Sequence, residues 1–160
     1  GGGGLEAEII GIAKRVSGSP GGYLQPFALV EGDDPSDMVC GGNVSILIEP
    51  LFPEDEVVYN LISSTVEARS PCCYVRLFHR QLGGETALEI GPKGIVWADA
   101  NNKFSAPVEK NLEKRLVAWA QVILKEGNQT IHILNPEMLG LRPSAKWNMA
   151  VLEVLQVFPR

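Results

Sequence analysis

The feature that most constrains the fold of this chain is an apolar stripe at helical spacing between residues 105 and 127. The stripe consists of Val108, Leu112, Leu116, Trp119 and Ile123. Ser105 and Pro107 mark its start, and Lys125 with Gly127 marks its end. A helix with one apolar side must bury that side against another layer of structure, so the sequence predicts a layered domain.

Two more helices and a series of short strands are expected around this helix. One helix covers residues 5–16, where Leu5, Ile9, Ile12 and Val16 recur at helical spacing, and the other opens at Pro53. Strands are expected at residues 23–30, 44–49, 72–79, 87–90, 95–98, 130–134 and 149–158, with turns at 82–85 and 91–94. The pattern predicts a mixed sheet with about three helices, of the α/β or α+β class, in a single domain spanning residues 1–160.

Composition excludes several classes of protein. The 160 residues carry a net charge of -5, and no basic stripe is present to bind nucleic acid. No run of about 18 apolar residues is present, so no membrane-spanning helix is expected. Three cysteines, an odd number, argue against a disulfide framework and favour a reducing, cytoplasmic setting.

Two glycine motifs are candidate ligand contacts. The first is the run Gly1 to Gly4, and the second is Cys40-Gly41-Gly42. Both leave backbone N–H groups unobstructed, and such groups at a helix N-terminus attract anions. A cysteine in this setting gains thiolate character and can bind a metal or carry sulfur. The alternatives are a glycine tail without a ligand, and a small apolar residue at the start of a strand.

Other reactive side chains have structural interpretations beside functional ones. Cys72 and Cys73 are adjacent in a strand, so they should point to opposite faces and serve packing. His79 could line a pocket for anions together with Arg76 and Arg80, or it could lie at a solvated strand end. No histidine or second cysteine lies near Cys40 in sequence, which argues against a closed zinc site.

The order and spacing of the two glycine motifs resemble those of a known family. The matching residues are the run Gly1 to Glu8, Met38, Cys40-Gly41-Gly42, and Ile48-Glu49-Pro50 at the end of an apolar strand. Over its first 50 or so residues, the chain resembles the xanthine dehydrogenase accessory factor family, of the XdhC/CoxI type.

The resemblance implies a maturation factor for molybdenum hydroxylases rather than an enzyme. Such a factor binds the molybdenum cofactor (molybdopterin), supports its sulfuration by a cysteine desulfurase, and delivers it to the apo molybdenum hydroxylase, commonly as a homo-oligomer. By this analogy the cofactor would contact Gly1, Gly2, Gly3, Gly4, Glu6, Cys40, Gly41 and Gly42, with Cys40 the contact for metal or sulfur. The family's preceding strand and following Rossmann-type domain are not expected within these residues.

Two alternatives stay open. In the first, Cys40 forms a persulfide and the protein is a thiol-dependent sulfur carrier. In the second, the chain is a protein-interaction domain without a ligand, and the strands at residues 23–30 and 149–158 offer edges for pairing.

Overall fold

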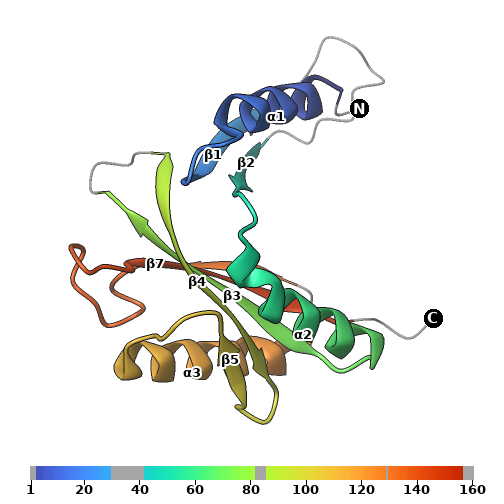
Figure 1. Cartoon of the computed structure of the whole chain (residues 1–160), viewed down its shortest axis with the longest axis vertical. Coiled ribbons are helices and arrows are strands. Elements are labelled where there is room, and N and C mark those ends of the chain that lie inside the picture. Colours follow the sequence, from blue (N-terminus) through green and yellow to red (C-terminus); the bar gives the residue numbers. More distant parts are fainter. Residues whose placement is uncertain (1–2, 30–41, 82–85, 129, 157–160) are drawn as a thin grey trace.

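The computed structural model describes residues 3–29, 42–81, 86–128 and 130–156. The elements in chain order are α1 (Gly3–Val16), β1 (Gly22–Leu29), β2 (Gly42–Ile48), the 3₁₀ helix η1 (Pro53–Asp55), α2 (Glu56–Glu67), β3 (Cys72–Arg80), β4 (Ala87–Trp97), β5 (Asn102–Phe104), α3 (Lys110–Glu126), β6 (Ile131–Leu134) and β7 (Met149–Leu155). Across these ranges the chain forms three α-helices and one curled seven-stranded sheet (Figure 1). The predicted α+β class is confirmed.

The sheet has the strand order β2-β1-β4-β3-β7-β6, with β5 added beside β4. Every strand pair in the described residues is antiparallel. The predicted turn at 82–85 lies outside the described residues. The edge predicted for residues 149–158 is wrong within its described part, because β7 is flanked by β3 and β6.

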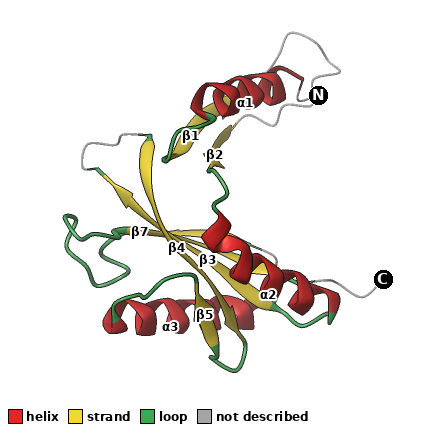
Figure 2. Ribbon diagram, in the orientation of Figure 1, coloured by secondary structure: helices red, strands yellow, loops and turns green. Residues whose placement is uncertain are grey.

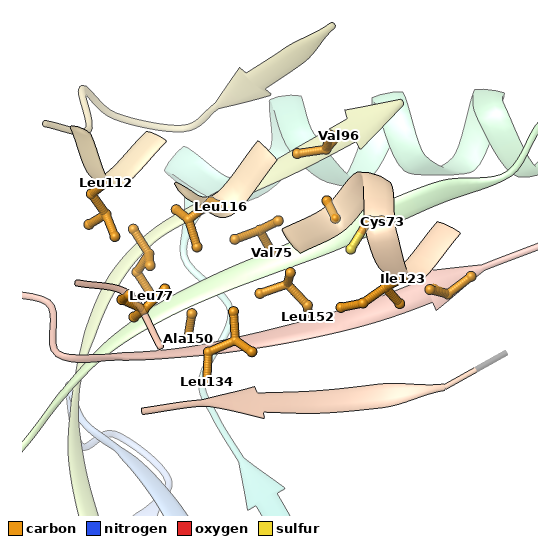
Figure 3. Packing of buried hydrophobic residues seen from close by; sticks show 13 residues of the cluster. Cys73, Val75, Leu77, Val96, Leu112, Leu116, Ile123, Leu134, Ala150 and Leu152 are labelled. Carbon is orange, nitrogen blue, oxygen red and sulfur yellow. The ribbon is translucent and has the colours of Figure 1, made fainter. Parts of the chain in front are cut away.

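Helix α3 covers one face of the sheet and forms the larger core with it (Figure 3). Leu112, Leu116 and Ile123 of α3 pack against Cys73 and Val75 of β3, in a cluster that also includes residues of β4, β6 and β7. Because side chains alternate along a strand, Cys72 and Tyr74 face the other side, where they pack with Val58 of α2. The part of the sheet formed by β3, β4, β5, β6 and β7, here called the central sheet, therefore lies between α2 and α3, as the ribbon in Figure 2 shows.

Helix α3 begins later than the sequence predicts. Its first residue is Lys110, and the Glu109 carboxylate accepts hydrogen bonds from the backbone N–H groups of Asn111 and Leu112, each at 3.1 Å. These bonds satisfy donors that the first helical turn leaves without partners. The C-terminal prediction is confirmed, since Gly127 adopts a left-handed conformation with φ 71° directly after the helix.

The turn predicted at residues 91–94 is wrong, because β4 continues through it as one strand. Between the pairs Arg76–Lys93 and Phe78–Ile90, β4 carries one residue more than β3, which is a β-bulge. Pro92 lies in this bulge, between the segments of β4 that pair with β1 and with β5. A proline without an N–H group is tolerated there because no ladder bond is required of it.

The two glycines of the same segment allow aromatic rings to approach the strand closely. A Cβ at Gly94 would lie 2.5 Å from the Phe104 ring, and one at Gly91 would lie 2.8 Å from the Trp147 ring. Phe104 belongs to β5, a short strand that the sequence analysis missed. The glycines that indicated a turn are therefore packing positions within a strand.

The segment that comprises α1, β1 and β2, here called the N-terminal lobe, extends away from the central sheet (Figure 1). Only the first two residues of β1 pair with β4, through Gly22–Leu88 and Tyr23–Ala87. Leu24 and Leu47 add apolar contacts with Phe78 and Leu88. The lobe is thus attached over a small area.

Candidate functional site

The N-terminal lobe contains the described residues of both glycine motifs, which are Gly3, Gly4 and Gly42. Helix α1 is joined to β1 by residues 17–21 only, and β1 leads away from the central sheet to Leu29, which pairs with Gly42. The lengths of α1 and β1, about 21 Å and about 26 Å, are similar. Gly42 therefore lies at the end of β1 that is farther from the residues paired with β4, and Gly3 begins the helix of the same lobe.

The first turn of α1 is exposed at Gly4 and Glu6. A Cβ at Gly4 would meet no atom within 4 Å, so packing within the described chain does not require glycine there. Glu6 lies exposed in the first turn of α1, where it interacts favourably with the positive end of the helix dipole and would compete with a bound anion. The predicted contacts Gly1, Gly2, Cys40 and Gly41 lie outside the described residues.

A second feature, which the sequence analysis missed, is a buried ion cluster on the α2 face of the sheet. It consists of Glu49, Asp55, Arg76, Lys93 and Glu153. Arg76 contacts Glu49 at 3.3 Å and Glu153 at 2.9 Å. Lys93, whose side chain is 1% exposed, contacts Asp55 at 2.5 Å and Glu49 at 3.8 Å. Charges removed from water to this degree are tolerable only when they are paired.

The cluster joins five parts of the chain. Glu49 directly follows β2, Asp55 ends η1, Arg76 and Lys93 are paired residues of β3 and β4, and Glu153 lies on β7. Glu49 Oε2 and Arg76 Nε are buried without a hydrogen-bond partner in the structure. A buried polar atom of this kind indicates that the cluster is not saturated and can take up a further polar group such as water.

Glu49 belongs to the Ile48-Glu49-Pro50 segment that contributes to the family resemblance. In the structure its carboxylate is 10% exposed and lies where the N-terminal lobe meets the sheet. Its partner Arg76 is 27 residues away in sequence. The isolated charge in an apolar segment was the only available signal, and it could not identify the partners.

The prediction for Cys72 and Cys73 is confirmed. The two side chains are fully buried on opposite faces of β3, in separate apolar clusters. Burial raises the pKa of the Cys72 thiol to about 11 and that of Cys73 to about 12. Neither forms an appreciable amount of thiolate at neutral pH, so neither is a candidate nucleophile.

His79 lines a cavity of about 660 Å³ at the junction of the lobe and the sheet. Arg76 is not among the residues that line this cavity, because its guanidinium is held between Glu49 and Glu153. The predicted grouping of His79 with Arg76 is therefore wrong. Arg80 does not line the cavity either.

The described residues contain no group of three or more histidine, cysteine, aspartate or glutamate side chains arranged to hold a metal ion. Among the same residues, no helix is long and apolar enough to cross a membrane. No family model matches the chain, and comparison with curated proteins finds no relative.

Proposed function

We propose that this protein is a maturation factor that binds the molybdenum cofactor at the distal side of its N-terminal lobe and assists its sulfuration and insertion into a molybdenum hydroxylase. One structural observation supports the proposal. Gly3 and Gly42, which belong to two glycine motifs about forty residues apart in sequence, begin α1 and β2 of the same lobe. The open space beside Gly4 leaves the first turn of α1 accessible.

The proposed contacts suit the chemistry of a pyranopterin. Its phosphate would accept hydrogen bonds from the backbone N–H groups at the start of α1. Its molybdenum is thiophilic, and Cys40 is the proposed thiolate for it or for sulfur. When bound, the cofactor would supply the metal centre that the client hydroxylase uses, while this chain would hold it and shield it.

The attachment of the lobe fits a carrier that meets large partners. The lobe projects from the central sheet (Figure 1), and Gly3, Gly4 and Gly42, the described members of the proposed contacts, belong to it. A cysteine desulfurase and an apo molybdenum hydroxylase are the proposed partners, and the functional form is proposed to be a homo-oligomer in the cytoplasm.

The test is anaerobic native mass spectrometry of the full chain after co-expression with the enzymes of molybdenum cofactor synthesis. We expect a bound cofactor mass and pterin absorbance, both lost in Cys40→Ala. Cys72→Ala is the matched control, because it removes a buried thiol from β3, which lies outside the N-terminal lobe. An apo mass for the unmodified chain, or equal loading in Cys40→Ala, would contradict the proposal.

The same samples distinguish the sulfur-carrier alternative. After incubation with a cysteine desulfurase and cysteine, a persulfide on Cys40 without any bound pterin would favour that alternative. Cofactor loading without a persulfide would favour the chaperone. Because Cys72 and Cys73 are buried, a modification detected in the folded protein can be assigned to Cys40.

A further inference from the structure

The cavity beside His79 exists because two strands of the sheet separate. β1 and β4 pair through only two residues of each strand, and beyond these pairs β1 leads into the N-terminal lobe. The gap is lined by the turn at Ser19 to Gly22, by Phe52, and by the segment of β4 around Glu89. Its volume of about 660 Å³ is within the range of small-molecule sites.

The glycines at this junction keep the cavity in its present form. A Cβ at Gly21 would lie 3.0 Å from the Leu88 carbonyl oxygen, and one at Gly22 would lie 3.2 Å from that of Ile48. A larger residue at position 21 would push the turn away from β4, and one at position 22 would push β1 away from the end of β2. The close approach positions Tyr23 at the cavity wall across from the residues of β4.

The charged side chain among the described residues that line the cavity is a carboxylate. Tyr23 contributes an aromatic ring and Glu89 a carboxylate on the face that carries His79, and the described lining residues include no lysine or arginine. Glu89 is exposed and pairs in register with His79 on β3, so the carboxylate and the imidazole lie on the same face of neighbouring strands. The side-chain charge of the lining is therefore negative.

The hydrogen bond between His79 Nδ1 and the Ala145 carbonyl oxygen determines whether Nε2 donates or accepts. Nδ1 lies 3.0 Å from the Ala145 carbonyl oxygen, which can only accept, so Nδ1 carries the proton. In the neutral ring Nε2 is then an acceptor. His79 and Glu89 together offer acceptors, and a ligand that satisfies both must bring donors.

We propose that this cavity binds a small organic cation, in which an ammonium or amidinium group is attached to an aromatic or apolar body. Glu89 and His79 Nε2 accept hydrogen bonds from the cationic group, and Tyr23, on the same face, flanks the body of the ligand. The cavity lies at the end of β1 that pairs with β4, whereas Gly42, a described member of the proposed cofactor contacts, pairs with Leu29 at the other end. The two sites are therefore separate, and either can exist without the other.

The test uses phenethylammonium and benzamidinium as probes, with phenylacetate as the anionic analogue of similar size. Binding to the full chain is measured by isothermal titration calorimetry, and its position by amide chemical shifts. We expect both cations to bind with shifts at Tyr23, His79 and Glu89, and phenylacetate not to bind. Equal or tighter binding of phenylacetate, or no cation binding at millimolar concentration, would overturn the proposal.

Two substitutions test the assigned acceptors. Glu89→Gln keeps the shape of an exposed side chain and removes its charge, and we expect an affinity loss of about tenfold for both cations. His79→Asn keeps an N–H donor for Ala145 and removes the Nε2 acceptor, so affinity should also fall while the fold is retained. Glu137→Gln, outside the cavity, is the control. Unchanged affinity in Glu89→Gln would contradict the proposal.

Discussion

At the scale of single residues, this protein places ionisable groups inside its fold in two different ways. The thiols of Cys72 and Cys73 are buried in apolar clusters and kept neutral. Lys93 is buried as a charge and Arg76 is partly buried as one, and both contact carboxylates. The buried neutral thiols make the free energy of unfolding decrease at alkaline pH. The buried charges contribute to stability only while each of them keeps its partner.

We predict that the free energy of unfolding falls as the pH rises above about 9. In the unfolded chain both thiols titrate near 9, whereas in the folded protein their pKa values are about 11 and about 12. Between these values the unfolded state has released protons that the folded state retains, so rising pH favours unfolding. Burial also raises the pKa of Tyr74, which adds to the effect at higher pH.

Urea unfolding measured between neutral pH and about pH 11 checks this prediction. The Cys72→Ala/Cys73→Ala double variant should show a shallower decline than the unmodified chain, because two of the responsible groups are removed. Equal declines in the two proteins would show that the thiols do not cause the pH dependence.

Replacing one partner of the Lys93–Asp55 ion pair should lower the free energy of unfolding far more than replacing both partners. Lys93→Met leaves the Asp55 carboxylate, which is buried at 4% exposure, without its cation, and we expect a loss of about 3–5 kcal/mol in unfolding free energy. Lys93→Met/Asp55→Asn should recover much of this loss, because the asparagine is neutral and can still accept from the Phe52 N–H. A double variant as unstable as Lys93→Met would contradict this account.

At the scale of elements, β4 shows how a strand can be held by residues that sequence patterns assign to turns. Gly91 and Gly94 leave room for Trp147 and Phe104, and Pro92 lies in a bulge. The strand therefore depends on its small residues for packing rather than for backbone flexibility.

Gly94→Ala tests this role of glycine. Its new methyl group would meet the Phe104 ring at 2.5 Å, and we expect a loss of about 1–3 kcal/mol in unfolding free energy. In the Phe104→Ala background the same substitution should cost less, as a double-mutant cycle measured by urea unfolding would show. Gly11→Ala, in the middle of α1 with only the Arg15 guanidinium within 4 Å, should be neutral or stabilising.

Sequence patterns predicted the helices well where the apolar residues recur at a regular helical spacing. The stripes of α1 and α3 follow the helical period, and both helices are observed close to their expected ranges. Patterns failed where a residue serves a distant partner. Gly94 accommodates Phe104, and Glu49 pairs with Arg76, and neither relation appears in the local sequence. The ion cluster and the cavity could not be predicted because the topology of the sheet creates them.

At the scale of the whole molecule, the N-terminal lobe is a separate projection joined to the sheet by few interactions. They include the two residue pairs between β1 and β4, the hydrogen bond from the Leu24 N–H to the Thr86 carbonyl oxygen, the apolar contacts of Leu24 and Leu47, and the ion pairs of Glu49. Glu49 is the one member of the ion cluster that directly follows the lobe in the chain. It therefore restrains how the lobe leaves the sheet, and with it the width of the cavity lined by Tyr23 and His79.

We predict that Glu49→Gln loosens the lobe without unfolding the sheet. The substitution removes the charge that faces Arg76 and Lys93, and a charge-assisted hydrogen bond of this kind is worth about 1.5–3 kcal/mol. Amide hydrogen exchange in β1 and β2 should therefore become at least about tenfold faster, while that of β3 and β7 changes little.

The matched control is Glu153→Gln, because Glu153 also pairs with Arg76 but lies on β7 and contributes nothing to the lobe. It should leave exchange in β1 and β2 unchanged, even if it lowers overall stability. If both variants accelerated exchange equally throughout the chain, the cluster would act on the stability of the whole fold and would not restrain the lobe. Faster exchange confined to the lobe in Glu49→Gln alone would identify Glu49 as the residue that controls its attachment.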